Sequence, residues 1–298
     1  MTDGDDRPVL DYHHPDDPQF GLRHVTDDKE RHQDALADLR GDADEDGIEI
    51  RTQLESVNGM TAYLVYTKEA PEEPFPEFKT DEEIVTWLQK WFDTDDLPIV
   101  LTVFRIFRGI LEEKADHGNE LQLYKQLQFE KLPEVIDRVE WRQSVPAVGS
   151  KLLSNFILAH PMPNANHRTA ITLLDRYLTS IDPDFEMPDP GEEGEWYPWA
   201  ADFVHASKRL LTLRRDVPKF RYAAAIGYEL VQRKEGITID LDDVDLDHDD
   251  HRNYYREQHC QRAREFVDVL LEHADAETLQ SVTDDGKEAF VARLRADQ

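Results

Sequence analysis

The chain has 298 residues, enough for one large domain or for a core domain with smaller appendages. It carries 64 acidic residues against 34 basic ones, and this net charge of -30 argues against nucleic acid bound through a broad basic face. No apolar run approaches the roughly 20 residues that span a bilayer, and the acidic start lacks the pattern of a signal peptide, so we expect a cytoplasmic protein without a membrane segment.

The acidity concerns the whole surface. In dilute salt this much like charge repels itself and weakens the compact state. Molar salt shortens the Debye length to about 3 Å and removes most of that penalty. The composition is therefore similar to that of proteins from salt-accumulating halophiles, and it says little about a substrate. Cys260 is the one cysteine, which excludes an intrachain disulfide.

Residues 1–79 are expected to form an acidic, partly irregular N-terminal segment. Residues 1–47 are rich in Asp, His and Pro, and we interpret them as loop with one short helix around residues 27–39. Residues 48–51 and 62–66 have the apolar pattern of strands and flank Asn58-Gly59, a favoured hairpin turn. The sequence therefore predicts a small β-hairpin, followed by a linker at 71–76.

Residues 80–235 are expected to form a helical core, so the predicted fold class is mainly α. Thr80 and Glu83 form a capping box ahead of the first apolar helical face. Apolar residues then recur at helical spacing through much of the segment. The stretches concerned are 84–91, 101–111, 121–139, 146–157, 170–181, 199–214 and 218–233. Between two of them, residues 183–198 read as an acidic, proline-rich loop.

Residues 236–298 are expected to be an acidic linker with a C-terminal helical extension. The connector at 240–250 is dominated by Asp, and helices are predicted at 251–273 and 278–295. His248, His251, His259 and Cys260 lie close together in sequence, and Zn²⁺ ligands have this kind of chemistry. We favour the simpler interpretation, in which they are solvated polar residues beside the acidic connector.

One stretch, from His160 to Ala170, carries a chemical signal. A helix ends near His160, because Pro161 and Pro163 cannot continue it, and a new helix begins near Asn164 or Asn166, either of which can cap it. The first amides of a helix lack intrahelical partners and attract anions. Arg168 can grip phosphate oxygens with its planar fork, and His160 has the pKa range of a general base. This arrangement suits transfer of a phosphorus group to a hydroxyl.

The stretch resembles the signature of the Fic/Doc family, which reads His-x-Phe-x-(Asp/Glu)-(Gly/Ala)-Asn-(Gly/Lys)-Arg. His160, Ala165, Asn166 and Arg168 match it. The resemblance implies a Fic/Doc-like helical core over roughly 97–233. It also implies that His160 is the catalytic base, that Asn166 and Arg168 hold nucleotide phosphates, and that Ala165 supplies backbone donors.

The stretch also departs from that signature. Met162 stands in place of the aromatic anchor, and Asn164 replaces the acid that holds Mg²⁺, although an amide oxygen can still contact the ion. His167 occupies a position usual for Gly or Lys, where it is either a further phosphate contact or a space-filling residue. Ile171 stands where Fic proper often has Arg. These departures favour the Doc-type branch or a divergent chemistry.

The resemblance implies nucleotide-dependent modification of a protein hydroxyl, on Ser, Thr or Tyr, by phosphoryl or AMP transfer. ATP would be the co-substrate, with Mg²⁺ a further candidate at Asn164, and the protein would be an adenylyltransferase or a Doc-like protein kinase. An antitoxin or another inhibitory protein is a possible partner in this family. The alternative is a catalytically inactive relative that binds a nucleotide or a protein partner.

Overall fold

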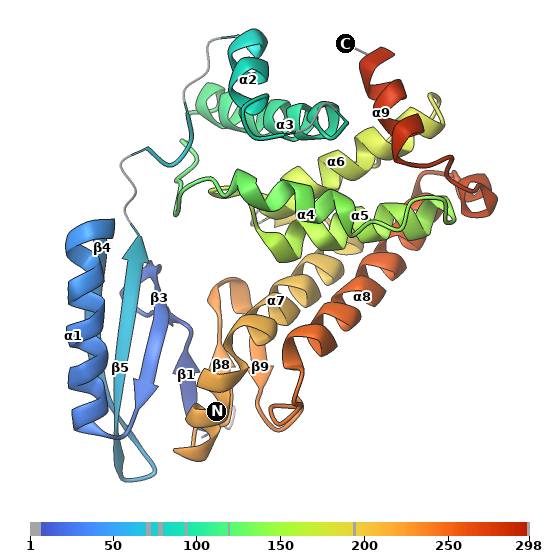
Figure 1. Cartoon of the computed structure of the whole chain (residues 1–298). Coiled ribbons are helices and arrows are strands. Elements are labelled where there is room, and N and C mark those ends of the chain that lie inside the picture. Colours follow the sequence, from blue (N-terminus) through green and yellow to red (C-terminus); the bar gives the residue numbers. More distant parts are fainter. Residues whose placement is uncertain are drawn as a thin grey trace. The chain divides into compact units, whose positions relative to one another are not determined.

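Each of the two compact units of this chain is built from two separate stretches of sequence. The computed structural model describes residues 7–69, 73–76, 80–92, 95–118, 120–192 and 195–296. The first unit comprises residues 1–72 and 208–256, and the second comprises 73–207 and 257–298. The three consecutive segments expected from the sequence, 1–79, 80–235 and 236–298, stay a prediction. The chain is mainly helical, as expected (Figure 1).

The first unit contains an antiparallel sheet with strand order β2-β3-β5-β4. Its central hairpin joins β4 (Ile48–Val57) to β5 (Met60–Glu69), and Val57 pairs with Met60 at the turn. Asn58 and Gly59 both adopt positive φ angles, of 51° and 82°, which a tight hairpin turn requires. The predicted hairpin is thus confirmed, with longer strands than expected.

In residues 7–47 the helix expected around residues 27–39 is present, but the expectation of loop for the rest is wrong, and residues 1–6 lie outside the described part of the chain. This part of the chain holds β1 (Val9–Asp11), β2 (His13–His14), β3 (Asp17–Thr26) and the long helix α1 (Lys29–Asp46). In β3 the buried residues Phe20 and Leu22 lie on either side of Gly21, and Pro18 and Gly21 obscure this alternation in the sequence. Long-range pairing with β5 stabilises the strand despite its weak local preference.

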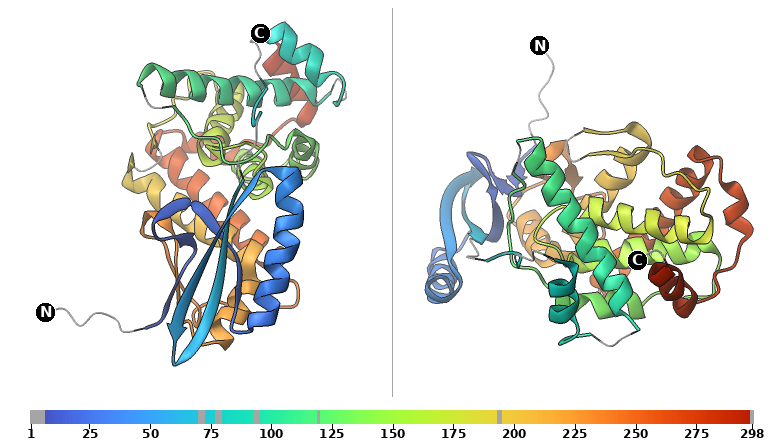
Figure 2. Two further views of the ribbon diagram at one scale, coloured as in Figure 1. Left: turned by 90° about the vertical axis from the view of Figure 1, so that its left-hand side faces the viewer. Right: turned by 90° about the horizontal axis from the view of Figure 1, so that it is seen from above.

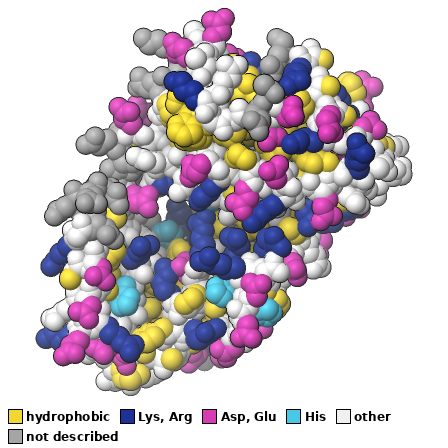
Figure 3. All heavy atoms as spheres, in the orientation of Figure 1, with side chains coloured by type: hydrophobic (Ala, Val, Ile, Leu, Met, Phe, Trp, Pro, Cys, Tyr) yellow, Lys and Arg dark blue, Asp and Glu magenta, His cyan; other side chains and the backbone are white. Residues whose placement is uncertain are grey.

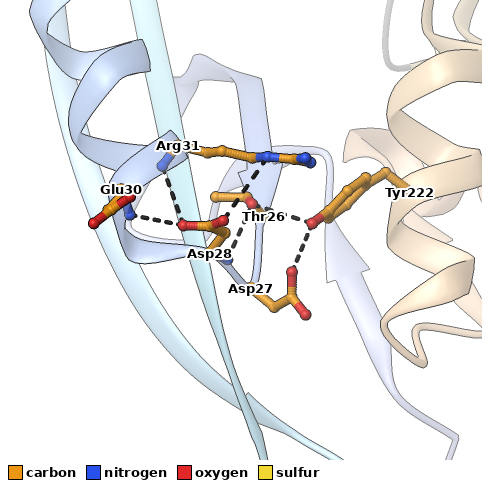
Figure 4. Close-up of polar contacts among 6 residues, drawn as sticks. All are labelled: Thr26, Asp27, Asp28, Glu30, Arg31 and Tyr222. Atoms are coloured by element: carbon orange, nitrogen blue, oxygen red, sulfur yellow. Dashed lines mark hydrogen bonds and ion pairs between the residues drawn. The ribbon is translucent and has the colours of Figure 1, made fainter.

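Helix α1 begins where Asp28 caps it (Figure 4). The Asp28 carboxylate accepts hydrogen bonds from the backbone amides of Glu30, at 2.8 Å, and Arg31, at 3.3 Å. Thr26 Oγ1 accepts from the Asp28 amide at 3.1 Å, and Tyr222 donates to the neighbouring Asp27 at 2.6 Å. These contacts fix both the start of the helix and its place in the unit.

A second sheet in the first unit joins distant parts of the chain. Strand β1 pairs in parallel with β8 (Leu230–Gln232), which pairs antiparallel with β9 (Thr238–Asp240). The helix predicted over 218–233 is therefore wrong at its C-terminal end. The structure has one helix, α7 (Pro198–Ala225), that continues through Pro218 in place of two. It stops before Gly227, whose φ of 104° no helix can contain.

The second unit is helical. Its helices are α2 (Asp81–Leu88), α3 (Leu97–Asp116), α4 (Leu132–Asp137), α5 (Val145–Ala159), α6 (Asn166–Ile181) and α9 (Lys287–Ala296), with parts of α7 and α8 (His251–His273). Thr80 caps α2 by accepting from the Glu83 amide at 3.3 Å, as predicted. The loop predicted at 183–198 holds a small pair of strands, β6 (Gly191–Glu192) and β7 (Glu195–Trp196).

Two predicted helices of this unit are only partly present. Residues 120–128 lack regular structure and precede a 3₁₀ turn at Phe129–Lys131. No helix forms here because backbone amides of this segment bond to other loops. The Gln128 amide, for example, donates to the Pro161 carbonyl at 2.9 Å. The helix predicted at 278–295 divides into a 3₁₀ turn (Glu277–Ser281) and α9. Gly286, with a φ of 110°, separates the two.

Helix α6 packs against both α5 and α3 in the second unit (Figures 1 and 2). Its inner face is fully buried at Leu174, Tyr177 and Leu178, which share one core with the apolar faces of α3 and α5. The loop at 160–165 connects α5 to α6, so the core of this unit fixes both ends of that loop. Among the described residues, no helix is both long and apolar enough to cross a membrane.

Candidate functional site

The loop between α5 and α6 begins at His160, which caps α5 in a left-handed conformation (φ 51°, ψ 54°). Lys125 holds this turn, because its ammonium donates both to the His160 carbonyl and, at 2.9 Å, to Gln128 Oε1. The segment around Lys125 therefore lies along the loop and braces it. Pro161 and Met162 are buried, and they anchor the loop in the core of the unit.

The Asn166 side chain stabilises this loop through several hydrogen bonds. Its Oδ1 accepts from the Met162 amide at 2.9 Å, and its Nδ2 donates to the Met162 carbonyl at 2.9 Å. The same Nδ2 lies 3.3 Å from Nδ1 of His160. An amide nitrogen only donates, so Nδ1 accepts and a neutral His160 carries its proton on Nε2. In this arrangement the Nε2 atom is a hydrogen-bond donor, whereas a general base needs it as an acceptor.

Asn164 and Ala165 also form contacts within the loop. Asn164 Oδ1 accepts from the Ala165 amide at 2.6 Å, and Asn164 Nδ2 donates to the Gln122 carbonyl at 2.7 Å. The residue that precedes α6 is Ala165, with a left-handed φ of 51° and no side-chain cap, whereas we expected Asn164 or Asn166 to cap the helix. The Ala165 amide, expected to face a phosphate, is engaged by Asn164.

The residues present do not form a Mg²⁺ site around Asn164. Mg²⁺ prefers near-octahedral oxygen coordination that includes carboxylates, whereas the Asn164 oxygen already accepts a backbone hydrogen bond. In the part of the chain that the structure describes, no group of three or more His, Cys, Asp or Glu side chains could hold a metal ion. We therefore derive no step of a reaction through a metal.

His167 faces the interior of the second unit. Its Nε2 lies 2.9 Å from Ser207 Oγ, which in turn lies 2.7 Å from Nε2 of His259. The other ring nitrogen of His259 lies 2.7 Å from Ser154 Oγ, itself 3.3 Å from the sulfur of Cys260. His259 is fully buried, so the interpretation of it as a solvated residue is wrong. The chain of contacts joins α5, α6, α7 and α8.

Arg168 points away from both the loop and this buried chain. Its guanidinium donates to Glu113 of α3 at 2.5 Å. The hydrogen bond from Arg168 is the main cause that lowers the pKa of Glu113, and the positive charges of Arg168 and Lys114 act in the same direction. Glu113 is thus a carboxylate at neutral pH, and the pair joins the first turn of α6 to the last turns of α3.

Arg168 and Glu113 lie at one end of a pocket between α3 and α6, with Leu294 of α9 as a further wall. We call it the arginine pocket, and its volume is about 560 Å³, within the range of small-molecule sites. Its lining residues are Thr102, Arg105, Ile106, Gly109, Ile110, Glu113, Arg168, Thr172, Arg176 and Leu294. Isoleucine and leucine side chains form the apolar part of the lining.

The polar lining follows from helical spacing. On α6, residues 168, 172 and 176 are four apart, and on α3 so are residues 105, 109 and 113, so each set lies on one face of its helix. The helices run in opposite directions (Figure 1). Because Arg168 meets Glu113 at one end of the pocket, Arg176 and Arg105 lie toward the other end. Three arginines against one glutamate give the lining a formal charge of +2.

This charge stands out in a chain whose net charge is -30. Figure 3 shows one face of the molecule, on which Lys and Arg side chains lie among Asp and Glu side chains. Arginine guanidinium groups suit phosphate and carboxylate ligands in particular, because their planar forks donate two parallel hydrogen bonds.

The structure brings together only some of the residues expected to share a site. His160, Asn164, Ala165 and Asn166 are linked in the loop, while His167 and Arg168 point to other neighbours. Arg105 and Arg176 were not predicted as site residues from the sequence. Both belong to sets of residues spaced by four along largely apolar helices. Such a spacing indicates a polar stripe next to the buried face of the helix.

The structure defines a mainly helical protein with a cationic pocket in its helical unit. Over residues 7–298 the chain matches a family described as a family of unknown function, DUF8172, and it belongs to that family. No curated protein matches the chain. No solved structure matches it either. The resemblance to the Fic/Doc family is therefore wrong: the family match covers nearly the whole chain, and the Fic/Doc family is not matched.

Proposed function

We propose that this protein binds a small phosphorylated ligand, of which a nucleotide such as ATP is one class, in the arginine pocket. The observation that carries the proposal is the set of three arginines, from two facing helices, around a pocket of about 560 Å³. The apolar residues of the lining provide contacts for a base or another apolar group, and the guanidinium groups provide contacts for phosphate oxygens.

Titration calorimetry with ATP, pyrophosphate and inorganic phosphate tests this proposal. It is carried out at low and at molar KCl, because screening weakens contacts between exposed charges. We expect Arg176→Gln to weaken binding about tenfold, since a hydrogen bond to a charged group contributes roughly 1.5–3 kcal/mol. Arg262→Gln, an exposed surface change in α8, is the matched control and leaves binding unchanged. Wild-type protein that binds none of the three ligands refutes the proposal.

Transfer of a phosphoryl or AMP group to a protein hydroxyl is the second candidate function. The observation that favours it is that Arg168 of the pocket and His160 flank the same short loop, with His160 only half-buried. For His160 to act as base through Nε2, its ring must give up the contact with Asn166 or change tautomer. Binding without transfer needs no such rearrangement, and we therefore prefer it.

Incubation with ATP labelled at the α or the γ phosphate, together with cell lysate, separates the two candidates. Label transferred from the α position indicates AMP transfer, and label transferred from the γ position indicates phosphoryl transfer. Either label must disappear in His160→Ala if His160 is the base. ATP binding without transfer of either label supports the binding function and rejects the transferase.

A further inference from the structure

The two ends of the arginine pocket differ in how their cations are compensated. At one end, Glu113 neutralises Arg168 directly at 2.5 Å. At the other end, Arg176 is exposed and makes no hydrogen bond or ion pair with any described residue, although the adjacent Asp175 senses its charge. Arg105, on the facing helix, contacts Asp81 through Nε at 2.8 Å. An anion entering the pocket therefore finds its least compensated cation at Arg176.

From this asymmetry, and resting on the proposed function, we infer that Glu113 determines the specificity of the pocket. Its carboxylate pairs with Arg168 and neutralises the charge there. The pocket is therefore limited to ligands that have an apolar body and one compact anionic group, bound near Arg176. A second anionic group reaching Arg168 has to displace the Glu113 carboxylate, which would then lie next to it. Like charge at close range is an effective way to reject a competing ligand.

The spacing along α6 sets which ligands are affected. Arg168 and Arg176 are eight residues apart, which is about 12 Å along a helix. A single phosphate group is much smaller than this spacing. A molecule with a phosphate at each end of a six-carbon chain can extend from one toward the other. Glu113 therefore discriminates between hexane-1,6-diol bisphosphate and hexyl monophosphate, which share the same apolar chain.

Titration calorimetry with these two probes tests the inference on the full-length protein. For the wild type we expect dissociation constants within about threefold of each other, since the second phosphate gains no free cation. For Glu113→Gln we expect the bisphosphate to bind at least tenfold more tightly than the monophosphate, because the amide removes the negative charge that would repel a second phosphate next to Arg168. Glu112→Gln, which makes the same charge change at the neighbouring exposed position, keeps the wild-type ratio.

Each other outcome is informative. If Glu113→Gln and Glu112→Gln raise the affinity for both probes by the same factor, the effect is one of general charge, and the specificity role of Glu113 is overturned. A wild-type protein that already prefers the bisphosphate tenfold also overturns it. If the wild type binds neither these probes nor ATP, pyrophosphate or inorganic phosphate, the proposed function itself fails. Circular dichroism and a urea titration confirm that both variants are folded before the ratio is compared.

Discussion

Ser207 Oγ lies 2.7 Å from Nε2 of His259, although the two residues are 52 positions apart in sequence. The same hydroxyl lies 2.9 Å from Nε2 of His167. A serine hydroxyl can donate one hydrogen bond and accept another, so Ser207 can satisfy an acceptor nitrogen on one ring and an N–H on the other. Ser207 and His259 are fully buried, so water cannot substitute for either partner without a change of packing.

We expect Ser207→Ala to lower the free energy of unfolding by roughly 1–3 kcal/mol, because it removes a hydrogen-bond partner from two buried imidazoles at once. Urea denaturation at fixed salt measures the change. Ser281→Ala, at an exposed position in the same unit, is the control and should stay within about 0.5 kcal/mol of the wild type. Equal stability of the two variants would mean that the chain of contacts contributes nothing to the fold.

Gly149 of α5 lies directly against side chains of α6. A Cβ atom at this position would lie 2.8 Å from Leu174 Cδ1 and 3.5 Å from Tyr177 Cε1, both in the core. We expect Gly149→Ala to cost roughly 1–3 kcal/mol, the range for overpacking a core. Gly109→Ala is a matched change in α3 with nothing within 4 Å of the new Cβ, so it should stabilise the helix by up to about 1 kcal/mol.

If the packing is as described, thermal and urea denaturation show a loss of stability for Gly149→Ala and a gain for Gly109→Ala. A Gly149→Ala protein as stable as the wild type would show that Leu174 moves aside freely and that α5 and α6 are not closely packed. Because Gly109 lines the arginine pocket, its variant also serves in the binding assays, where a new methyl group takes up part of the space for a ligand.

Several elements could be predicted because their signals are local. The hairpin at Asn58-Gly59, the Thr80 cap and the boundaries of α8 each depend on neighbouring residues. By contrast, β1 pairs with β8, more than 200 residues further along the chain, and local periodicity cannot reveal that pairing. Tertiary packing also overrides a local signal at Pro218, where α7 continues through a residue that usually ends helices.

The candidate site shows the same limit at the level of side chains. The turn after His160 was predicted from its prolines, and a helix does begin at Asn166. Consecutive residues of a helix point about 100° apart, since 3.6 residues make one turn. Asn166, His167 and Arg168 therefore reach three different neighbours, and a linear motif cannot tell which neighbours these are. The partners Glu113 and Ser207 come from helices far away in sequence.

Buried tyrosines make the fold sensitive to alkaline pH. Burial raises the pKa of Tyr177 far above its usual value near 10, and the carboxylate of Asp284, which accepts from its hydroxyl at 2.7 Å, acts in the same direction. Burial likewise raises the pKa of Tyr255 to about 12. Below pH 10 these phenols are neutral in both states. As the pH rises further, the unfolded chain ionises first, so the free energy of unfolding falls.

For Tyr177 this loss amounts to about 1.4 kcal/mol at pH 11, from a pKa near 10 in the unfolded chain. Tyr177→Phe lacks the ionisable group, so its stability should fall less steeply between pH 8 and pH 11. The difference in free energy of unfolding between the wild type and Tyr177→Phe should therefore narrow by about that amount from pH 8 to pH 11. Urea titrations of both proteins at the two pH values measure it, and parallel losses would show that Tyr177 ionises equally in the folded state.

His160 occupies a backbone position that glycine would suit better. Its φ of 51° lies in the left-handed region, where a side chain costs roughly 1 kcal/mol relative to glycine. His160→Gly and His160→Ala both remove the imidazole and its contact with Asn166, but only the glycine variant relieves the backbone. We expect His160→Gly to be about 1 kcal/mol more stable than His160→Ala in urea. If both variants lose ligand binding or label transfer to the same degree despite different stabilities, the imidazole serves the ligand rather than the fold. An alanine variant as stable as the glycine variant would contradict the left-handed turn on which the geometry of this loop depends.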